Sequence, residues 1–150
     1  MILPITLTLA GAAALLNIWI AQRVGKARIA HKVSIGDGGN AALTARMRAH
    51  SNYAEYTPFF LILVLLIEMA KGSELWLWIV GVVYILARIA HVFGMEARGK
   101  PGKLRLVGIV VTMLVLLGLA LYAIFISYMD APQPRARSEA PITSAAAARP

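Results

Sequence analysis

Two long stretches of this 150-residue chain, residues 1–22 and residues 106–129, carry no charged side chain. Each exceeds the roughly 20 residues that a helix needs to cross the ~30 Å hydrocarbon layer of a bilayer. Two further apolar stretches, at 56–70 and 75–93, are interrupted only by the charged residues Glu68 and Arg88 and by His91. The pattern therefore predicts an all-α membrane protein, a bundle of four transmembrane helices surrounded by membrane lipids.

Turn-forming residues set the expected ends of these helices. SIGDGGN at 34–40 and RGKPG at 98–102 are rich in Gly and Pro, and KGS at 71–73 predicts a short turn in which Ser73 caps the next helix. Pro58 is expected to kink a helix rather than end it. The predicted helices are Ile5–Lys32, Ala41–Lys71, a third that follows Ser73 and continues to Ala97, and Lys103–Tyr128.

The composition changes after the last helix. Residues 131–150 are rich in Pro, Ala and Arg, with Ile142 as their single bulky apolar residue. Such a segment cannot bury enough apolar surface to fold. We therefore expect a membrane domain over residues 1–130 and a disordered tail over 131–150.

The net charge of +8 would suit a nucleic-acid-binding protein, but the positions of the charges indicate a membrane topology instead. Lys and Arg crowd the first connection, between Arg23 and Arg48, and the third, over 98–105, whereas the second has only Lys71 beside Glu74. The positive-inside rule then places the first and third connections in the cytoplasm and both termini outside. The basic residues follow the first apolar stretch rather than precede it, so we expect a retained helix, not a cleaved signal peptide.

The chain has no cysteine. This excludes disulfides, zinc–thiolate sites and a thiol nucleophile borne by the protein. Any sulfur chemistry must therefore use the sulfur of a ligand.

A stripe of polar residues lies where the second helix enters the membrane. Arg48, Asn52 and Glu55 follow one another at helical spacing, so they share one face, with Tyr56 beside them and His50 pointing roughly the other way. A cation, an amide and a carboxylate on one face at the membrane edge indicate a ligand site.

The other helices supply polar residues at the same depth. The third helix carries a matching stripe with Arg88 and His91, while Arg28 and Arg105 lie at the cytoplasmic ends of the first and fourth. A polar pocket between helices would result. Two alternatives remain open: Arg88 could neutralise Glu55 in a purely structural ion pair, and His50 and His91 could bind haem. Glu68, near the outer end of its helix, is expected to be interfacial or to snorkel.

The motif RAHSNYAEYTPF at 48–59 resembles the Arg-Ala-x-x-Asn-x-x-Glu-x-x-Pro pattern of the MAPEG family, the membrane-associated proteins in eicosanoid and glutathione metabolism. ARIAH at 87–91 and LRL at 104–106 agree with it, and GDGGNAAL at 36–43 is similar to the bacterial branch. The likeness covers residues 5–128. It implies a left-handed four-helix bundle in a bacterial inner membrane, assembled as a homotrimer that binds glutathione between subunits near the cytosolic face.

The resemblance also implies roles for individual residues. Arg105 would face the glutathione sulfur as the catalytic residue. The residues that would bind the rest of glutathione are Arg28, Arg48, His50, Asn52, Glu55, Tyr56 and His91.

The family pattern is not complete, and this bears on the reaction. Met95 stands where family members commonly carry a tyrosine, and Leu106 stands where the prostaglandin E synthase branch has a serine. We expect a membrane glutathione transferase that acts on lipophilic electrophiles or peroxides. The alternatives are a non-catalytic membrane protein and a small multidrug exporter, although such exporters resemble a pattern with a glutamate in the first helix, which this chain lacks.

Overall fold

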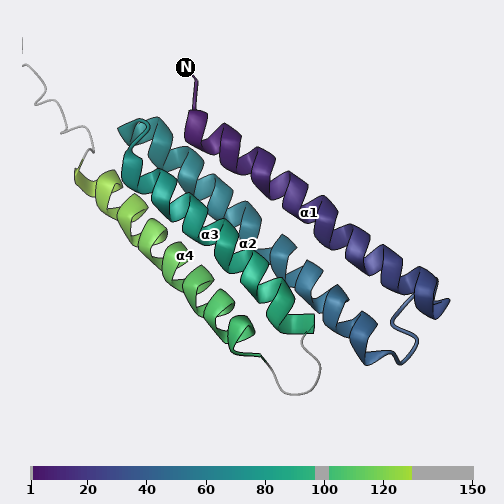
Figure 1. Cartoon of the computed structure of the whole chain (residues 1–150). Coiled ribbons are helices and arrows are strands. Elements are labelled where there is room, and N and C mark those ends of the chain that lie inside the picture. Colours follow the sequence, from purple (N-terminus) through teal and green to yellow (C-terminus); the bar gives the residue numbers. More distant parts are fainter. Residues whose placement is uncertain (1, 97–101, 130–150) are drawn as a thin grey trace, which may run out of the picture.

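The computed structural model describes residues 2–96 and 102–129 and has four helices: α1 (Pro4–His31), α2 (Ala41–Lys71), α3 (Leu75–Glu96) and α4 (Lys103–Met129) (Figure 1). All four are long and apolar enough to cross a membrane. This confirms the predicted all-α, four-helix membrane protein. α2 has the predicted bounds and runs through Pro58 without ending. The predicted tail at 131–150 and most of the predicted loop at 98–102 lie outside the described residues.

The two central helices of the bundle are α2 and α3. α1 packs on both, α4 packs on both, and within the described residues α1 and α4 do not touch each other. Figure 1 shows α1 and α4 at opposite edges. The N-terminal end of α1, the turn between α2 and α3 and the last turn of α4 share one end of the bundle, while the connection between α1 and α2 and the start of α4 share the other.

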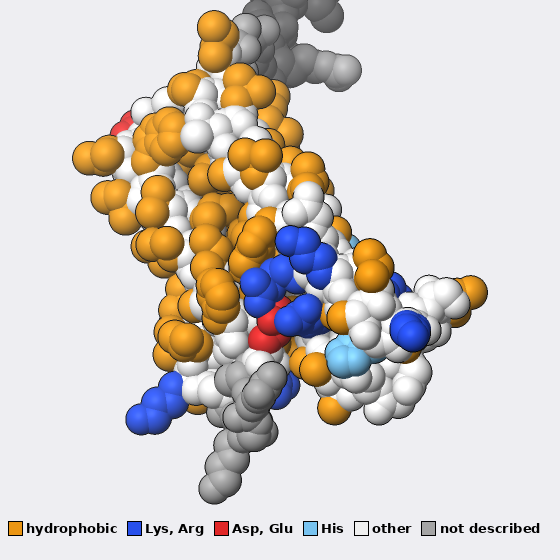
Figure 2. Space-filling model, turned by 45° about the vertical axis from the view of Figure 1, so that its right-hand side comes forward, with side chains coloured by type: hydrophobic (Ala, Val, Ile, Leu, Met, Phe, Trp, Pro, Cys, Tyr) orange, Lys and Arg blue, Asp and Glu red, His pale blue; other side chains and the backbone are white. Residues whose placement is uncertain are grey.

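Apolar side chains both fill the bundle and cover its outside. The larger core cluster includes Phe60 and Tyr84, whose rings stack with centroids 3.7 Å apart. Large apolar side chains on every helix also point outward, among them Leu15 on α1 and Leu114 on α4. In Figure 2 they cover most of the visible face, and Lys and Arg side chains gather toward one end. This distribution suits a surface solvated by lipid.

Glu68 has a different role from the one predicted. It is 1% exposed, and its carboxylate accepts hydrogen bonds from the backbone N–H groups of Ile5 and Thr6, from the Thr6 hydroxyl and from the Ser73 hydroxyl. The first N–H groups of a helix have no intrahelical acceptor, and a carboxylate there also interacts favourably with the helix dipole. Glu68 therefore does not snorkel as predicted, because its buried side chain holds the start of α1 against the end of α2.

Ser73 is likewise not the cap of α3. That helix begins at Leu75, two residues later, and the Ser73 hydroxyl donates to Glu68 instead (2.7 Å). A carboxylate is a stronger hydrogen-bond acceptor than a neutral group, so it accepts the hydrogen bond of the Ser73 hydroxyl.

The first connection is fixed by its own side chains. The Asp37 carboxylate accepts hydrogen bonds from the Gly39 N–H (3.0 Å) and the Thr44 hydroxyl (2.8 Å), and these two bonds, the backbone bond first, hold the pKa of Asp37 below its usual value. Asn40 caps α2 by accepting from the Leu43 N–H. Gly36, Gly38 and Gly39 adopt positive φ, as the predicted tight turn requires. The start of α2 is thereby positioned relative to the end of α1.

Candidate functional site

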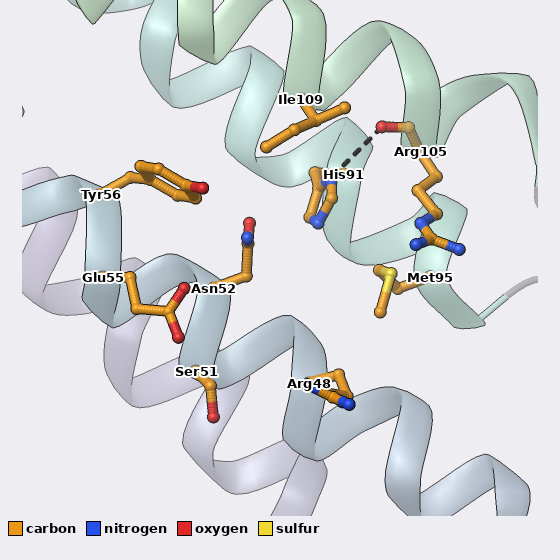
Figure 3. A pocket seen from close by; sticks show the side chains of 9 residues that line it. All are labelled: Arg48, Ser51, Asn52, Glu55, Tyr56, His91, Met95, Arg105 and Ile109. Carbon is orange, nitrogen blue, oxygen red and sulfur yellow. Dashed lines mark hydrogen bonds between the residues drawn. The ribbon is translucent and has the colours of Figure 1, made fainter.

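A pocket of about 600 Å³ opens between α2, α3 and α4, in the half of the bundle nearest the first connection (Figure 3). It contains six of the predicted site residues, and α1 contributes none of its lining. The lining residues are Arg48, Ser51, Asn52, Glu55 and Tyr56 of α2, His91 and Met95 of α3, and Arg105 and Ile109 of α4.

Helical periodicity explains the contribution of α2. Arg48, Asn52 and Glu55 lie on one face, as predicted, and that face lines the pocket. Arg48 and Glu55 are exposed in the single chain, while Asn52 is partly buried. Ser51 was not predicted, although it lies three residues after Arg48 and four before Glu55, a spacing that would have placed it near the same face.

Two glycines bring α4 close enough to α3 to complete the pocket. A Cβ on Gly108 would lie 2.6 Å from the carbonyl oxygen of Ala87, and a Cβ on Gly94 would run into the backbone of Arg105. Larger residues at these positions would push the helices apart. The close approach places Arg105 beside His91.

His91 is fixed in one tautomer by this approach. Its Nδ1 lies 3.2 Å from the carbonyl oxygen of Arg105. A carbonyl oxygen can only accept, so Nδ1 carries the proton and donates it. Nε2 has no hydrogen-bond partner among the described residues, and in the neutral ring it is left as an acceptor for a ligand.

The structural ion pair between Arg88 and Glu55, one of the alternatives predicted from the sequence, does not form. Arg88 donates to the side-chain oxygen of Asn52 (2.8 Å) and to the Thr112 hydroxyl (3.4 Å). In the described part of the chain, the side-chain ion pairs within 4.0 Å join Glu96 to Arg23 and Arg46. Glu55 therefore keeps its carboxylate for a ligand.

Two predicted site residues lie outside this pocket. Arg28 donates to the carbonyl oxygens of Ser34 (3.3 Å) and Gly36 (2.8 Å) in the first connection. The Nε2 of His50 lies 3.0 Å from the side-chain oxygen of Asn17 on α1, so His50 points away from the polar stripe, as predicted. The single chain thus does not bring Arg28 or His50 to the other six residues.

No cluster of three or more His, Cys, Asp or Glu side chains among the described residues is placed to hold a metal ion. The polar groups available in the pocket are two exposed guanidinium groups, one carboxylate, one amide, one phenol, one imidazole and the Ser51 hydroxyl. Such a set suits a small ligand that carries several charges of both signs.

Comparisons with known proteins agree with the fold. The model of the MAPEG family matches residues 6–125. The chain is 36% identical over 86 residues to the inner membrane protein YecN of Escherichia coli strain K12, and the aligned part covers 57% of this chain and 65% of that protein. YecN from Escherichia coli O6:H1 matches to the same extent. The match thus spans slightly less than two thirds of the length of YecN, whose name specifies a membrane and no reaction.

Proposed function

Because the chain belongs to the MAPEG family, we propose that it binds glutathione in the pocket between α2, α3 and α4 and uses its thiolate against lipophilic electrophiles or peroxides. The observation that carries this proposal is the convergence of Arg48, Glu55 and Arg105, from two different helices, on one pocket with Asn52 and His91 between them. The volume of about 600 Å³ lies within the range of small-molecule sites.

The charges of the pocket match those of glutathione, which has two carboxylates, one ammonium group and one thiol. Arg48 can form paired hydrogen bonds with a carboxylate, and Glu55 can accept from the ammonium group. Asn52 and Tyr56 add neutral hydrogen-bonding groups on the same helix. The pocket therefore provides a partner of the right sign for one carboxylate and for the ammonium group, and Arg28, which lies outside it, is the proposed partner of the second carboxylate.

Arg105 is the residue that we assign to the sulfur. A free thiol has a pKa of about 8.5, and a nearby guanidinium group lowers it by favouring the thiolate, which is the nucleophile. In conjugation, the sulfur forms a bond to an electrophilic carbon while the leaving group departs with its electron pair. In peroxide reduction, two glutathione molecules are oxidised to the disulfide while the O–O bond is cleaved and yields an alcohol and water.

The second substrate would enter from the bilayer. Leu106, Val107 and Val110 follow Arg105 on α4 and are exposed apolar side chains. A lipophilic molecule dissolved in the membrane could move along this surface to the sulfur. This is why we assign lipophilic rather than water-soluble electrophiles and peroxides.

We further propose that the protein is a homotrimer in a bacterial inner membrane, with the pocket end in the cytoplasm and both termini outside. The basic residues of the first connection and of the start of α4 lie at the pocket end, as the positive-inside rule requires of a cytoplasmic face. Arg28 and His50 would reach the ligand from a neighbouring copy, because neither lines the pocket of its own chain.

The test is a calorimetric titration of the purified, detergent-solubilised protein with glutathione, followed by assays with model electrophiles and lipid peroxides. We expect a Kd between about 1 μM and 1 mM, the usual range for enzyme substrates. Arg105→Ala should raise the apparent pKa of the bound thiol, measured from thiolate absorbance against pH, whereas Arg48→Ala should weaken binding without that shift. A wild-type protein that binds no glutathione would rule the proposal out, and binding without turnover would leave the non-catalytic alternative.

A further inference from the structure

Arg88 differs from the other arginines around the pocket because it is 0% exposed. No carboxylate lies within 4.0 Å of it among the described residues, and its Nε is a buried donor without a hydrogen-bond partner. Removing a charge from water costs several kcal/mol unless close partners compensate it. An ionisable residue held in the membrane under these conditions is a candidate for a functional role.

The contacts of Arg88 lead to the pocket. One terminal nitrogen donates to the Asn52 side-chain oxygen at 2.8 Å, and the guanidinium carbon lies 5.8 Å and 5.9 Å from the ring centres of Tyr53 and Tyr56. Asn52 and Tyr56 both line the pocket, whereas Arg88 itself does not. Arg88 therefore acts on any ligand through its neighbours and through its charge.

The Arg88 contact fixes the orientation of the Asn52 amide. A guanidinium group has donors and no acceptor, so the amide oxygen must face Arg88 and the NH₂ group is left for the pocket. That NH₂ group has no hydrogen-bond partner among the described residues. Asn52 is thus held ready to donate to a carbonyl or carboxylate oxygen of the ligand.

Arg88 also changes the charge balance around the ligand. The exposed pocket residues Arg48, Arg105 and Glu55 leave one net positive charge, and Arg88 beneath them raises it to two. Glutathione has one net negative charge as the thiol and two as the thiolate. Within one chain, these four charges therefore equal and oppose those of the thiolate form, and Arg28 of a neighbouring copy would add one more positive charge that also favours the thiolate.

We propose that Arg88 is a positioning residue that holds the Asn52 amide toward the ligand and that its buried charge favours the doubly negative, thiolate form of glutathione. This inference rests on the proposed glutathione site. Arg105 remains the group assigned to the sulfur. Arg88 adds its positive charge from its buried position behind Asn52 and Tyr56.

The principal variant is Arg88→Met, tested in the full-length protein in detergent. Arg88 has no ion-pair partner among the described residues, so an apolar side chain of similar size leaves no uncompensated charge behind, and we expect the variant to fold. Glutathione affinity should fall by about tenfold or more, the usual effect of losing a hydrogen bond to a charged group, and the apparent pKa of the bound thiol should rise. S-methylglutathione, which has no ionisable thiol, should lose less affinity than glutathione.

Two further variants separate positioning from charge. Arg88→Lys keeps the charge but loses the fork of donors, so the thiol pKa should stay near that of the wild type while S-methylglutathione binds more weakly. The effects of Arg88→Met and Asn52→Ala on S-methylglutathione affinity should not add in the double variant, because both remove the same contact.

Arg23→Met is the matched control, since Arg23 pairs with Glu96 away from the pocket and its loss should leave glutathione affinity unchanged.

Unchanged affinity and thiol pKa in Arg88→Met would overturn the inference while leaving the proposed function in place. Additive effects with Asn52→Ala would overturn the positioning role. If Arg88→Met does not fold, Arg88→Lys replaces it in the test. Wild-type affinity of Arg88→Lys for S-methylglutathione would then overturn the positioning role. A wild-type protein that binds no glutathione would remove the proposed function and this inference together.

Discussion

Among the described residues, Glu55 is the only acidic one that lines the pocket, and it has no ion pair within 4.0 Å there. If it binds the ammonium group of glutathione, Glu55→Gln removes the charge and leaves the shape of the side chain nearly unchanged. We expect glutathione affinity to fall by roughly 1.5–3 kcal/mol, the range for hydrogen bonds to charged groups. Calorimetric titration of the variant measures this loss.

A ligand analogue provides the control for Glu55. A glutathione derivative without the amino group lacks the proposed partner, so Glu55→Gln should change its affinity little. The apparent pKa of the bound thiol should not rise, since Arg105 stays in place and the loss of a negative charge from the pocket favours the thiolate. Equal losses for glutathione and for the derivative would contradict the contact with the ammonium group.

The sequence was most informative where the spacing along one helix decides the outcome. Arg48, Asn52 and Glu55 were predicted to share a face, and they line one pocket, because helical periodicity is a local property. The partner of Arg88 could not be predicted in this way. Glu55 and Asn52 lie on the same face of α2, and only the packing of α3 decides that Arg88 reaches the amide instead of the carboxylate.

At the scale of helices, the buried Glu68 carboxylate joins α1 to α2. It accepts four hydrogen bonds, from Ile5, Thr6 and Ser73. In Glu68→Gln the amide NH₂ can no longer accept, so at least one donor loses its partner. We expect a loss of about 1–3 kcal/mol in stability, the cost of an unsatisfied buried group, and a melting temperature in detergent lower by several degrees.

Glu74→Gln is the matched control for Glu68→Gln, since Glu74 is an exposed glutamate just after the same turn. Its melting temperature should equal that of the wild type. Hydrogen exchange should show that the loss in Glu68→Gln is concentrated in the first turn of α1. Equal melting temperatures for both variants would show that the carboxylate does not stabilise α1.

Helix bounds were predictable because turn residues mark them, whereas contacts between helix ends were not. The GDGGN segment at 36–40 was predicted to separate the first two helices, and in the structure it lies between α1 and α2. Glu68 and Ile5 are 63 positions apart, and nothing in their local patterns indicates that they meet. For the same reason an interfacial role was predicted for Glu68 and a cap for Ser73.

At the scale of the whole molecule, the candidate site of the single chain is open to its surroundings. Arg48, Glu55 and Arg105 are exposed, and α1 lines no part of the pocket. A second copy that places its α1 against the opening would cover these charges and bring Arg28 to the ligand. Arg28 already donates to the carbonyl oxygens of its own first connection, so that copy would present Arg28 from the last turn of α1, held against this connection.

Co-expression of two variants tests this arrangement. Arg28→Ala and Arg105→Ala should each bind or turn over glutathione poorly when alone. If every site takes Arg105 from one subunit and Arg28 from its neighbour, random mixing in equal amounts restores both residues in about a quarter of the sites, as follows from a cyclic assembly of identical contacts. Glutathione turnover by tagged, co-purified mixed oligomers, compared with that of the wild type, measures the fraction of intact sites.

The control mixture combines Arg48→Ala with Arg105→Ala. Both residues line the pocket of the same chain, so no subunit in that mixture has both, and mixing should restore no site. Recovery in the first mixture without recovery in the second would locate the site between subunits. No recovery in either, with mixed oligomers confirmed by native mass measurement, would mean that Arg28 acts only within its own chain, where it holds the first connection.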